Sequence, residues 1–378
     1  MSLVIDFAAG EPHFADHLAP IYAALEPHER GRFFALGDGM VGYLARVYGI
    51  AAEPALRLEL GWPVVVASWG DLRAVTEGER RVPRPGGKPG VIVRQAGMSS
   101  ARTQPRVPVV FVEHGAGQTY RDTDSPSYAG GRRRDAVRLY LAPGDHVARN
   151  NAARYPDTPT EVVGCPKLDR WHLEGRPPAR RGAELGRRPA VAVSFHPDFP
   201  HIAPECLSAF SWYRDALASL AAADRPYDLL GHAHPRRWPE LRAWWAGIGV
   251  EPVERFDEVV ARADCYVVDN SSTLYEFASL DRPVVALDAP WMRRSVEHGL
   301  RFWSHADVGV RIGQASALDT AIRLALTDPA EIADRRRRLV ADVYAHVDGH
   351  AADRAVDAIR RHAYEWRLEA AGPRTSAS

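Results

Sequence analysis

The sequence predicts an α/β protein built from two doubly wound, Rossmann-type domains. A chain of 378 residues exceeds one ordinary hydrophobic core, so two domains are expected. Short apolar runs alternate with amphipathic helical stretches from end to end, which is the pattern of repeated strand–helix–strand units. The runs 64–66 and 109–112 contain no polar residue, as is typical of parallel strands that are covered on both faces.

The first domain is expected over residues 1–175. A stretch rich in Pro and Gly, Arg81–Gly90, is predicted to be a loop. We expect strands at 2–7, 32–36, 64–68, 91–94 and 109–112, continued by 138–142 and 161–163, and a helix at 14–25.

The second domain is expected over residues 190–370, after a linker at 176–189 that is rich in Pro, Arg and Gly. Residues 330–370 have strongly helical character, and 371–378 are expected to form a disordered tail. The two sheets are predicted to face each other across a central cleft. We expect strands at 190–194, 228–230, 250–253, 265–268 and 283–287, and helices at 210–222, 239–246, 257–263 and 272–279.

Composition excludes several classes of protein. Lys and Arg together number 48, as do Asp and Glu, so no overall positive charge attracts nucleic acid. The three cysteines form neither a metal-binding spacing nor a disulfide framework. The N-terminus lacks the charged and apolar regions of a signal peptide, and no apolar run approaches the about 20 residues of a membrane span. We therefore expect a cytoplasmic protein, for which contact with a membrane surface stays open.

The first chemical motif is the segment Val109–Tyr120, in which a buried strand runs directly into His114, Gly115 and further glycines. Ligands of doubly wound folds bind at the carboxyl ends of strands, and glycine lets the backbone approach a ligand closely. His114 can act there as a general base or bind a phosphoryl oxygen. The alternative is a strand-end turn with a packed histidine. A lipase-like reading fails because the chain has no Gly-x-Ser-x-Gly elbow.

The second motif is the segment Leu229–Arg237, where a strand again ends in Gly and His. His234 precedes a proline, which favours extended backbone, and Arg236 and Arg237 add the positive charge that suits a diphosphate. The alternative is a polar turn before a helix. His232 and His234 lack a neighbouring set of further metal ligands, so we predict no metal site here.

The third motif is the most specific and lies within Ala263–Pro290. A buried strand meets a helix at a run of hydroxyl and amide side chains, and a helix N-terminus of this kind suits a pyrophosphate. Plain capping is the alternative, since Ser–Glu spacing also forms a capping box, but capping does not explain the whole polar run. The residues expected to bind this ligand are Asp269, Asn270, Ser271, Ser272, Thr273 and Glu276.

Three weaker signals are discounted. Asp122-Thr123-Asp124 imitates a metal-binding Asp-x-Asp, but the match is short, and we expect neither a bound metal nor a cofactor. The run Arg335–Arg338 lies within helical sequence and is predicted to be a solvated face. Arg132–Arg134 is interpreted in the same way, with contact to an anionic membrane or an acceptor as the alternative.

Together these segments resemble the CDP-glycerol glycerophosphotransferase family of teichoic-acid and capsule synthesis. Five short motifs occur in the family's order between Val109 and Ile359, and that order is more specific than any single motif. They are His114-Gly115, Gly164–Asp169, His234-Pro235, Asp269–Glu276 followed by Asp281–Val284, and Asp348–Arg354.

The resemblance implies a GT-B fold and an enzyme that moves glycerol phosphate, or a related polyol phosphate, from a CDP-activated donor to an acceptor hydroxyl. The implied acceptor is a polyol phosphate, a glycan or a lipid-linked molecule at the inner face of the plasma membrane. His114 is expected to be the general base, and His234, with one of the arginines that follow it, to stabilise the leaving phosphate. The hydroxyl run Ser271–Thr273 would hold the pyrophosphate and Glu276 the ribose.

Several positions depart from the family pattern. Glu113 stands where Trp or Gln is usual, Glu276 where Asp is common, and Phe195-His196-Pro197 replaces Pro-Thr-x-Arg. The N-terminal third matches no part of the family that we recognise. Because the N-terminal domain binds the acceptor in that family, the identity of the acceptor is left open. A nucleotide-sugar glycosyltransferase or epimerase of the same fold, and a non-catalytic binding protein, remain as alternative functions.

Overall fold

The computed structural model of the chain describes ten segments, which group into two compact units. Unit 1 contains the described residues up to 173 and from 344 onward, and unit 2 contains those from 186 to 343. The described segments are 3–54, 63–77, 79–82, 91–94, 108–113, 136–173, 186–198, 207–269, 271–292 and 306–371.

The described residues of unit 1 form a seven-stranded parallel sheet in the order β3-β2-β1-β4-β7-β8-β9. The chain starts in the middle, moves outward through β2 and β3, and then crosses to β4 on the other side. The strand order therefore reverses between β1 and β4, which is the topological switch point of a doubly wound sheet. The strands are β1 Ile5–Ala9, β2 Arg30–Ala35, β3 Glu53–Pro54, β4 Val64–Val66, β7 Val109–Val112, β8 Val137–Ala142 and β9 Thr160–Val162.

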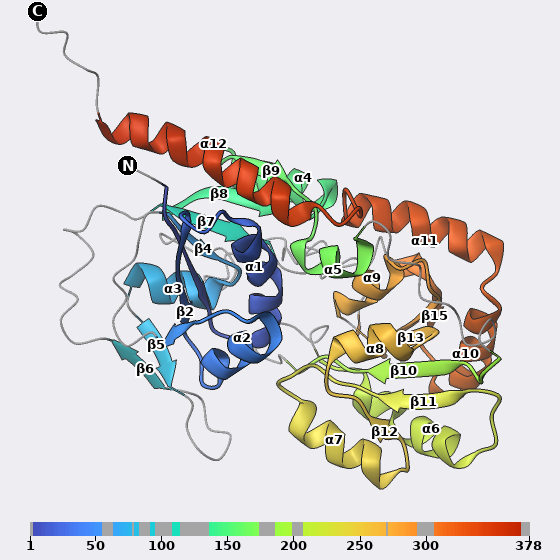
Figure 1. Ribbon diagram of the computed structural model, residues 1–378. Coiled ribbons are helices and arrows are strands. Elements are labelled where there is room, and N and C mark those ends of the chain that lie inside the picture. The colour runs from blue at the N-terminus through green and yellow to red at the C-terminus, as the bar shows by residue number, and fades with distance from the viewer. Residues whose placement is uncertain are drawn as a thin grey trace, which may run out of the picture. The chain divides into compact units, whose positions relative to one another are not determined.

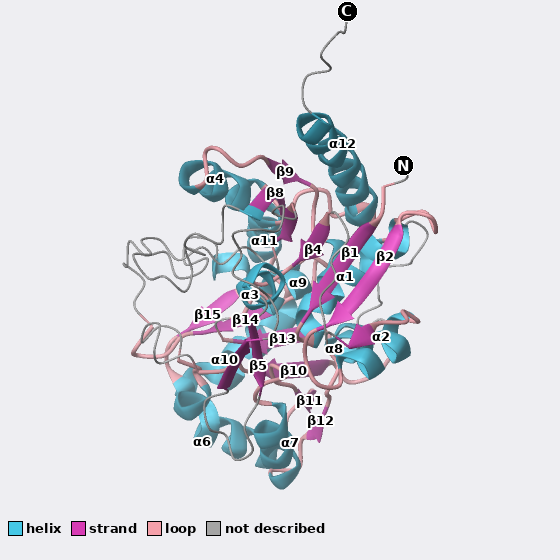
Figure 2. Ribbon diagram, turned by 90° about the vertical axis from the view of Figure 1, so that its left-hand side faces the viewer, coloured by secondary structure: helices cyan, strands magenta, loops and turns pink. Residues whose placement is uncertain are grey.

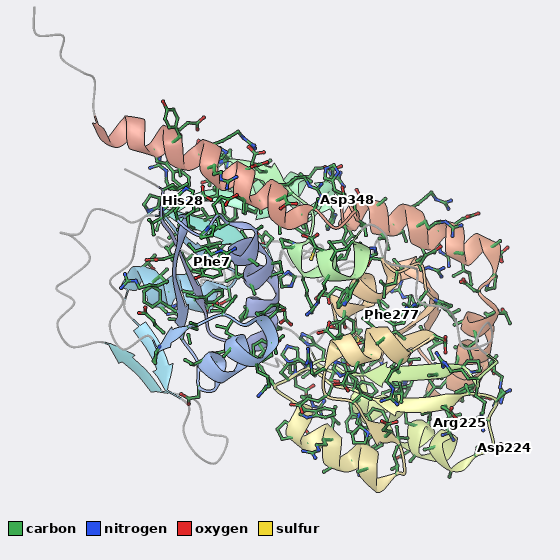
Figure 3. The ribbon with its side chains drawn as sticks, in the orientation of Figure 1. Phe7, His28, Asp224, Arg225, Phe277 and Asp348 are labelled. Atoms are coloured by element: carbon green, nitrogen blue, oxygen red, sulfur yellow. The ribbon has the colours of Figure 1, made fainter. Side chains whose placement is uncertain are left out.

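The core of unit 1 lies between this sheet and its helices. Phe7, labelled in Figure 3, lies in this core. Its ring stacks on Phe33 at 5.6 Å between centroids and meets the edge of Tyr22 at 5.4 Å. Helix α12 contributes Ile359 and Trp366 to the same core and runs beside α1 and β8 (Figure 1). The helices are α1 Pro12–Ala24, α2 Met40–Tyr48, α3 Trp69–Glu77, α4 Asp145–Arg154, α5 Asp169–His172 and α12 Ala351–Ala371, with a 3₁₀ turn at Pro166–Leu168.

The described residues of unit 2 form a six-stranded parallel sheet in the order β12-β11-β10-β13-β14-β15. Helices flank its strands (Figure 2). The order reverses between β10 and β13, so the switch point has the same topology as in unit 1. The strands are β10 Ala190–Ser194, β11 Asp228–Gly231, β12 Glu251–Pro252, β13 Cys265–Val268, β14 Val284–Leu287 and β15 Val310–Ile312.

Helices and one close approach complete the core of unit 2. A Cβ atom on Gly231 would lie 2.3 Å from the ring of Trp245, so only glycine lets this indole pack on β11. The helices are α6 Phe210–Ala222, α7 Trp238–Gly247, α8 Phe256–Arg262, α9 Thr273–Ala278, α10 Leu318–Thr327 and α11 Ala330–Val343, with 3₁₀ turns at Ala306–Val308 and Ala315–Ala317.

The predicted fold class is confirmed, because both units contain a doubly wound parallel sheet. One strand prediction needs correction. Residues Val91–Arg94 form β6, which pairs antiparallel with β5, Glu79–Val82, in a separate two-stranded sheet. Arg81 and Val82, predicted to begin a loop, therefore belong to a strand, because cross-strand pairing with β6 extends β5 to Val82. The rest of that predicted loop, the predicted linker up to residue 185 and the tail from 372 lie outside the described residues.

The helical stretch predicted over 330–370 divides into α11 and α12. Between them the backbone enters the left-handed region at His346 and Gly349, with φ of 55° and 84° (Asp348 in Figure 3 marks the place). A Cβ atom on Gly349 would lie 2.9 Å from the carbonyl oxygen of His172. The second helix belongs to unit 1, although the predicted second domain extends to residue 370. Helical periodicity shows that α12 has an apolar face but not which sheet that face covers.

The prediction that Arg335–Arg338 forms a solvated face is wrong for one of its residues. Arg336 is 0% exposed, and its Nη1 and Nη2 atoms lie 2.9 Å from Asp328 and 2.8 Å from Asp281. Both aspartates lie in the left-handed region, with φ of 46° and 52°. An arginine can be buried in this way only because two carboxylates pair with it. Within the described residues, no helix is long and apolar enough to cross a membrane.

Candidate functional site

The candidate site lies at the carboxyl edge of the sheet in unit 2. Strands β11, β10 and β13 are neighbours in that sheet, and each is followed by polar residues. His234 follows β11, His196 follows β10, and Asp269 follows β13. Because parallel strands end at the same edge, the fold brings these three segments together at the switch point, where doubly wound sheets bind ligands.

Asp269 holds this edge together. Its Oδ1 accepts the backbone N–H of His196 at 2.8 Å, and its Oδ2 accepts the Ser208 hydroxyl and the Ala209 N–H, both at 2.9 Å. Burial raises the pKa of the carboxyl to about 6, while these bonds and the positive charge of Arg237 oppose the shift. The carboxylate thus joins the ends of β10 and β13 to the start of α6. Its predicted contact with the donor stays a prediction.

Two histidine rings lie next to each other at this edge. The ring centroids of His196 and His234 are 5.4 Å apart in an edge-to-face arrangement. Nδ1 of His234 accepts the backbone N–H of Arg236 at 3.2 Å, so a neutral ring carries its proton on Nε2. Nδ1 of His196 lies 2.9 Å from the carbonyl oxygen of Pro197 and must donate to it, which leaves Nε2 of a neutral ring as an acceptor. In neutral rings, Nε2 of His234 is therefore a donor and Nε2 of His196 an acceptor.

His232 has a structural role. It is 5% exposed, and its Nδ1 donates to the carbonyl oxygen of Val253 at 2.9 Å. Its own carbonyl oxygen accepts the indole N–H of Trp245 at 3.2 Å. Among the described residues, no group of three His, Cys, Asp or Glu side chains is placed to hold a metal ion.

The two arginines after His234 differ. The Arg237 side chain is 12% exposed and lies 2.8 Å from Glu240, 3.7 Å from Asp198 and 5.1 Å above the ring centroid of Phe210. Its charge is therefore already compensated within the protein. Arg236 is exposed, and of the two it is the better placed to meet a phosphate.

The hydroxyl run at the start of α9 forms its own hydrogen-bonded chain. The Thr273 hydroxyl lies 3.0 Å from the phenol oxygen of Tyr266 and 2.9 Å from the Ser271 hydroxyl. The backbone N–H groups of Leu274 and Glu276 donate to carbonyl oxygens of Ser271 and Ser272. The side-chain hydroxyls, more than the backbone N–H groups, are thus the groups that the start of α9 can offer to a ligand.

Glu276 lies deeper than a surface ribose contact would require. It is 1% exposed, on the first turn of α9. Burial raises the pKa of the Tyr266 phenol, and the negative charge of Glu276 adds to that shift. The predicted contact between Glu276 and a ribose stays a prediction.

The structure brings most of the predicted donor residues of unit 2 to this edge. His114, Gly115, Asn270 and the segments with Asp122, Asp124 and Arg132–Arg134 lie outside the described residues. Sequence reasoning assigned no role to His196 or Ser208. The signal for His196 was present, because His196-Pro197 after β10 repeats the His234-Pro235 that follows β11. Ser208 had no comparable signal, since only the fold brings it to Asp269.

Comparison with known protein families gives one match, and it overlaps the candidate site. Residues 246–361 match the family described as CDP-Glycerol:Poly(glycerophosphate) glycerophosphotransferase, which confirms the resemblance over that segment. The segment includes β13 and α9 of the candidate site. No curated protein sequence matches this chain.

Solved structures share the fold over nearly the whole chain. A putative UDP-N-acetylglucosamine 2-epimerase from Listeria monocytogenes has a TM-score of 0.64 and 15% identity, with 97% of this chain and 98% of that chain covered. A UDP-GlcNAc 2-epimerase from Neisseria meningitidis gives 0.58 and 12%, with 95% and 100% covered. The wall teichoic acid polymerase TagF, soaked with CDPG, gives 0.59 and 12%, with 96% and 89% covered. At these identities the likeness shows the GT-B-like fold alone.

Proposed function

We propose that this protein transfers glycerol phosphate, or a related polyol phosphate, from a CDP-activated donor to an acceptor hydroxyl in the synthesis of a cell-surface polymer. The observation that carries the proposal is the family match over residues 246–361, which contain the polar strand end and helix start at Asp269–Glu276. The hydroxyl chain of unit 2 is chemically suited to a diphosphate, which accepts hydrogen bonds and favours nearby positive charge.

The donor would lie against unit 2. Ser271, Ser272 and Thr273 would donate hydroxyl hydrogen bonds to the pyrophosphate, and Arg236 would neutralise part of its charge. Glu276 would accept hydrogen bonds from the ribose. This arrangement supplies the positioning and charge neutralisation that phosphoryl transfer chiefly requires.

The chemical step would join the acceptor oxygen to the distal phosphorus of the donor. The bond from that phosphorus to the bridging oxygen breaks, and CMP leaves with the electron pair. His114 would take the proton of the acceptor hydroxyl. His234, whose neutral ring carries its proton on Nε2, would donate a hydrogen bond to the leaving phosphate.

The acceptor and location belong to the same proposal. A polyol phosphate, a glycan or a lipid-linked chain would supply the hydroxyl, in the cytoplasm at the inner face of the plasma membrane. Peripheral contact with anionic lipid would place the enzyme near a lipid-linked acceptor.

A nucleotide screen tests the donor. Thermal unfolding is measured with CDP, UDP, GDP and CDP-glycerol, because a ligand that binds the folded state raises the Tm by mass action. We expect CDP and CDP-glycerol to raise the Tm most and CDP-glycerol turnover to release CMP. Combining Ser271→Ala with Ser272→Ala should weaken CDP binding by about thirtyfold, since each of the two lost hydrogen bonds costs about 1 kcal/mol. Ser279→Ala is the matched control, because that hydroxyl donates to the Glu276 carbonyl at the far end of α9.

Other outcomes point to the alternatives. Stabilisation by UDP or GDP, with sugar transfer or epimerisation, would support a nucleotide-sugar enzyme of the same fold. If no nucleotide shifts the Tm, a non-catalytic binding protein becomes the better description.

A further inference from the structure

A second polar site lies at the switch point of unit 1, where β1 and β4 end. Ser68 lies between β4 and α3, and its hydroxyl oxygen accepts the backbone N–H of Asp71 at 3.0 Å. The Asp71 carboxyl lies against Gly10, which follows β1; a Cβ atom on Gly10 would come within 2.7 Å of Oδ1. Glycine at position 10 thus leaves room for a carboxyl between the two strand ends.

Asp71 is 4% exposed, yet its Oδ2 has no hydrogen-bond partner among the described residues. Burial raises the pKa of this carboxyl to about 7, and the negative charge of Glu11 adds to the shift. Hydrogen bonds with Ser68 and Gly10 oppose it. A buried oxygen without a partner is costly to the fold, so it calls for a functional explanation.

The next strand of the sheet adds a second carboxyl. Val66 of β4 pairs with Phe111 of β7, so Glu113 lies beyond the end of β7 at the level where Ser68 follows β4. Glu113 accepts the Asn151 side-chain amide at 3.2 Å. Asn151 is 0% exposed, and its Oδ1 has no partner within the described part of the chain. Removal from water raises the pKa of Glu113 to about 7.

The chemistry of this pair selects its ligand. Among the described residues, neither Asp71 nor Glu113 has an ion pair with Arg or Lys, so negative charge here repels a phosphate. No set of three ligands for a metal ion occurs among the described residues either. Carboxyl groups that titrate near neutrality can accept from a hydroxyl when ionised and donate to one when protonated. An uncharged molecule with several hydroxyls fits this site best.

We propose that Asp71 and Glu113 form a hydroxyl-binding subsite for an uncharged polyol or sugar moiety. Given the proposed function, this moiety is the part of the acceptor that carries the attacked hydroxyl. Glu113 directly precedes His114, so the subsite adjoins in sequence the residue assigned as general base.

The test measures sugar binding by the full chain without nucleotide. Saturation-transfer NMR is recorded with glycerol, ribitol, glucose and N-acetylglucosamine, and inorganic phosphate serves as competitor. We expect at least one neutral probe to bind, and Asp71→Asn and Glu113→Gln each to weaken it about five- to tenfold, the value of one or two hydrogen bonds. Phosphate should not compete.

Two controls separate recognition from folding. Asp6→Asn changes another buried carboxyl of the same sheet, whose Oδ1 accepts the Arg32 N–H at 2.8 Å, and it should leave probe binding unchanged while lowering the Tm. Ser279→Ala, at the end of α9 in unit 2, should also leave probe binding unchanged. The proposal is overturned if no probe binds, if both test variants bind as wild type does, or if phosphate displaces the probe. Because no nucleotide is present, these results do not depend on the donor screen.

Discussion

Two buried aspartates lie near the switch points of the two sheets and differ in their hydrogen bonding. Asp269 in unit 2 accepts three hydrogen bonds at 2.8 to 2.9 Å. Asp71 in unit 1 leaves Oδ2 without a partner among the described residues. Each lies where the strand order reverses, and burial raises the pKa of both carboxyls.

This difference shows that the sheet topology determines where a buried carboxyl lies but not whether it stabilises the fold or binds a ligand. Both carboxylate oxygens of Asp269 already accept hydrogen bonds. They hold the loops that carry His196 and Ser208, and little hydrogen-bonding capacity remains for a ligand. Asp71 keeps an acceptor unused, which favours recognition. Arg336 provides a third case, in which a buried charge is satisfied by two carboxylates and has no connection to the switch point.

The largest expected effect concerns the histidine that adjoins the second carboxyl of unit 1. We expect His114→Ala to lower kcat by about 10²–10⁴, as loss of a general base does, with CDP affinity largely kept. Strand-end loops contribute little to the core, so the Tm should change little. Turnover is followed by CMP release from the donor identified in the screen. Full activity of this variant would remove His114 from the mechanism.

The second prediction tests the comparison directly. Asp269→Asn should lower the free energy of unfolding by about 1–3 kcal/mol, because an amide group cannot accept all three donors that the carboxylate satisfies. Ser208→Ala removes one of these donors and should cost less, about 1 kcal/mol. Urea unfolding at pH 7 measures both. A neutral or stabilising Asp269→Asn would show that the three bonds do not hold the edge together.

The sequence predicted the fold well where the signal was local. The continuous apolar runs of β4 and β7 identified a parallel sheet, and the polar run from Asp269 identified a helix start at a strand end. Partners distant in sequence could not be predicted, as with Ser208 and Asp269, 61 residues apart. For the same reason, the sequence did not predict that Arg336 is buried, since its burial depends on Asp281. It also did not predict which sheet the apolar face of α12 covers. Asp71 carried no motif.

The third prediction concerns pH. The Asp71 carboxyl has a pKa of about 7 in the folded protein against an ordinary value of 3.8, so the folded state holds its proton more tightly. Wild-type stability from this group is therefore present at low pH and falls as pH rises from about 4 through 7. Asp71→Asn cannot titrate, so relative to wild type it should gain on the order of 4 kcal/mol between pH 4 and pH 8.

The measurement is urea unfolding of both proteins across that range. Glu113 and Asp269 also have raised pKa values, but they are common to both proteins and cancel in the difference. If the difference in free energy of unfolding between wild type and Asp71→Asn stays constant with pH, Asp71 is not held in a desolvated site.

The smallest expected effect concerns two neighbouring arginines, one largely buried and one exposed. Arg237 is held by Glu240, Asp198 and the face of Phe210, whereas Arg236 is exposed beside it. Arg236→Ala should therefore weaken CDP binding by about threefold to fivefold with no change in Tm, and the loss should shrink as salt is added, because an exposed charge is screened. Arg237→Ala should instead lower the Tm by a few degrees, since about 1 kcal/mol of packing and ion pairing is lost. Titration of CDP at about 50 and 500 mM salt, with thermal unfolding of each variant, distinguishes the two. If Arg237→Ala weakens CDP binding more than Arg236→Ala does at equal Tm, then Arg237 contacts the phosphate. In that case, ion pairing within the protein would not distinguish structural residues from binding residues at this edge.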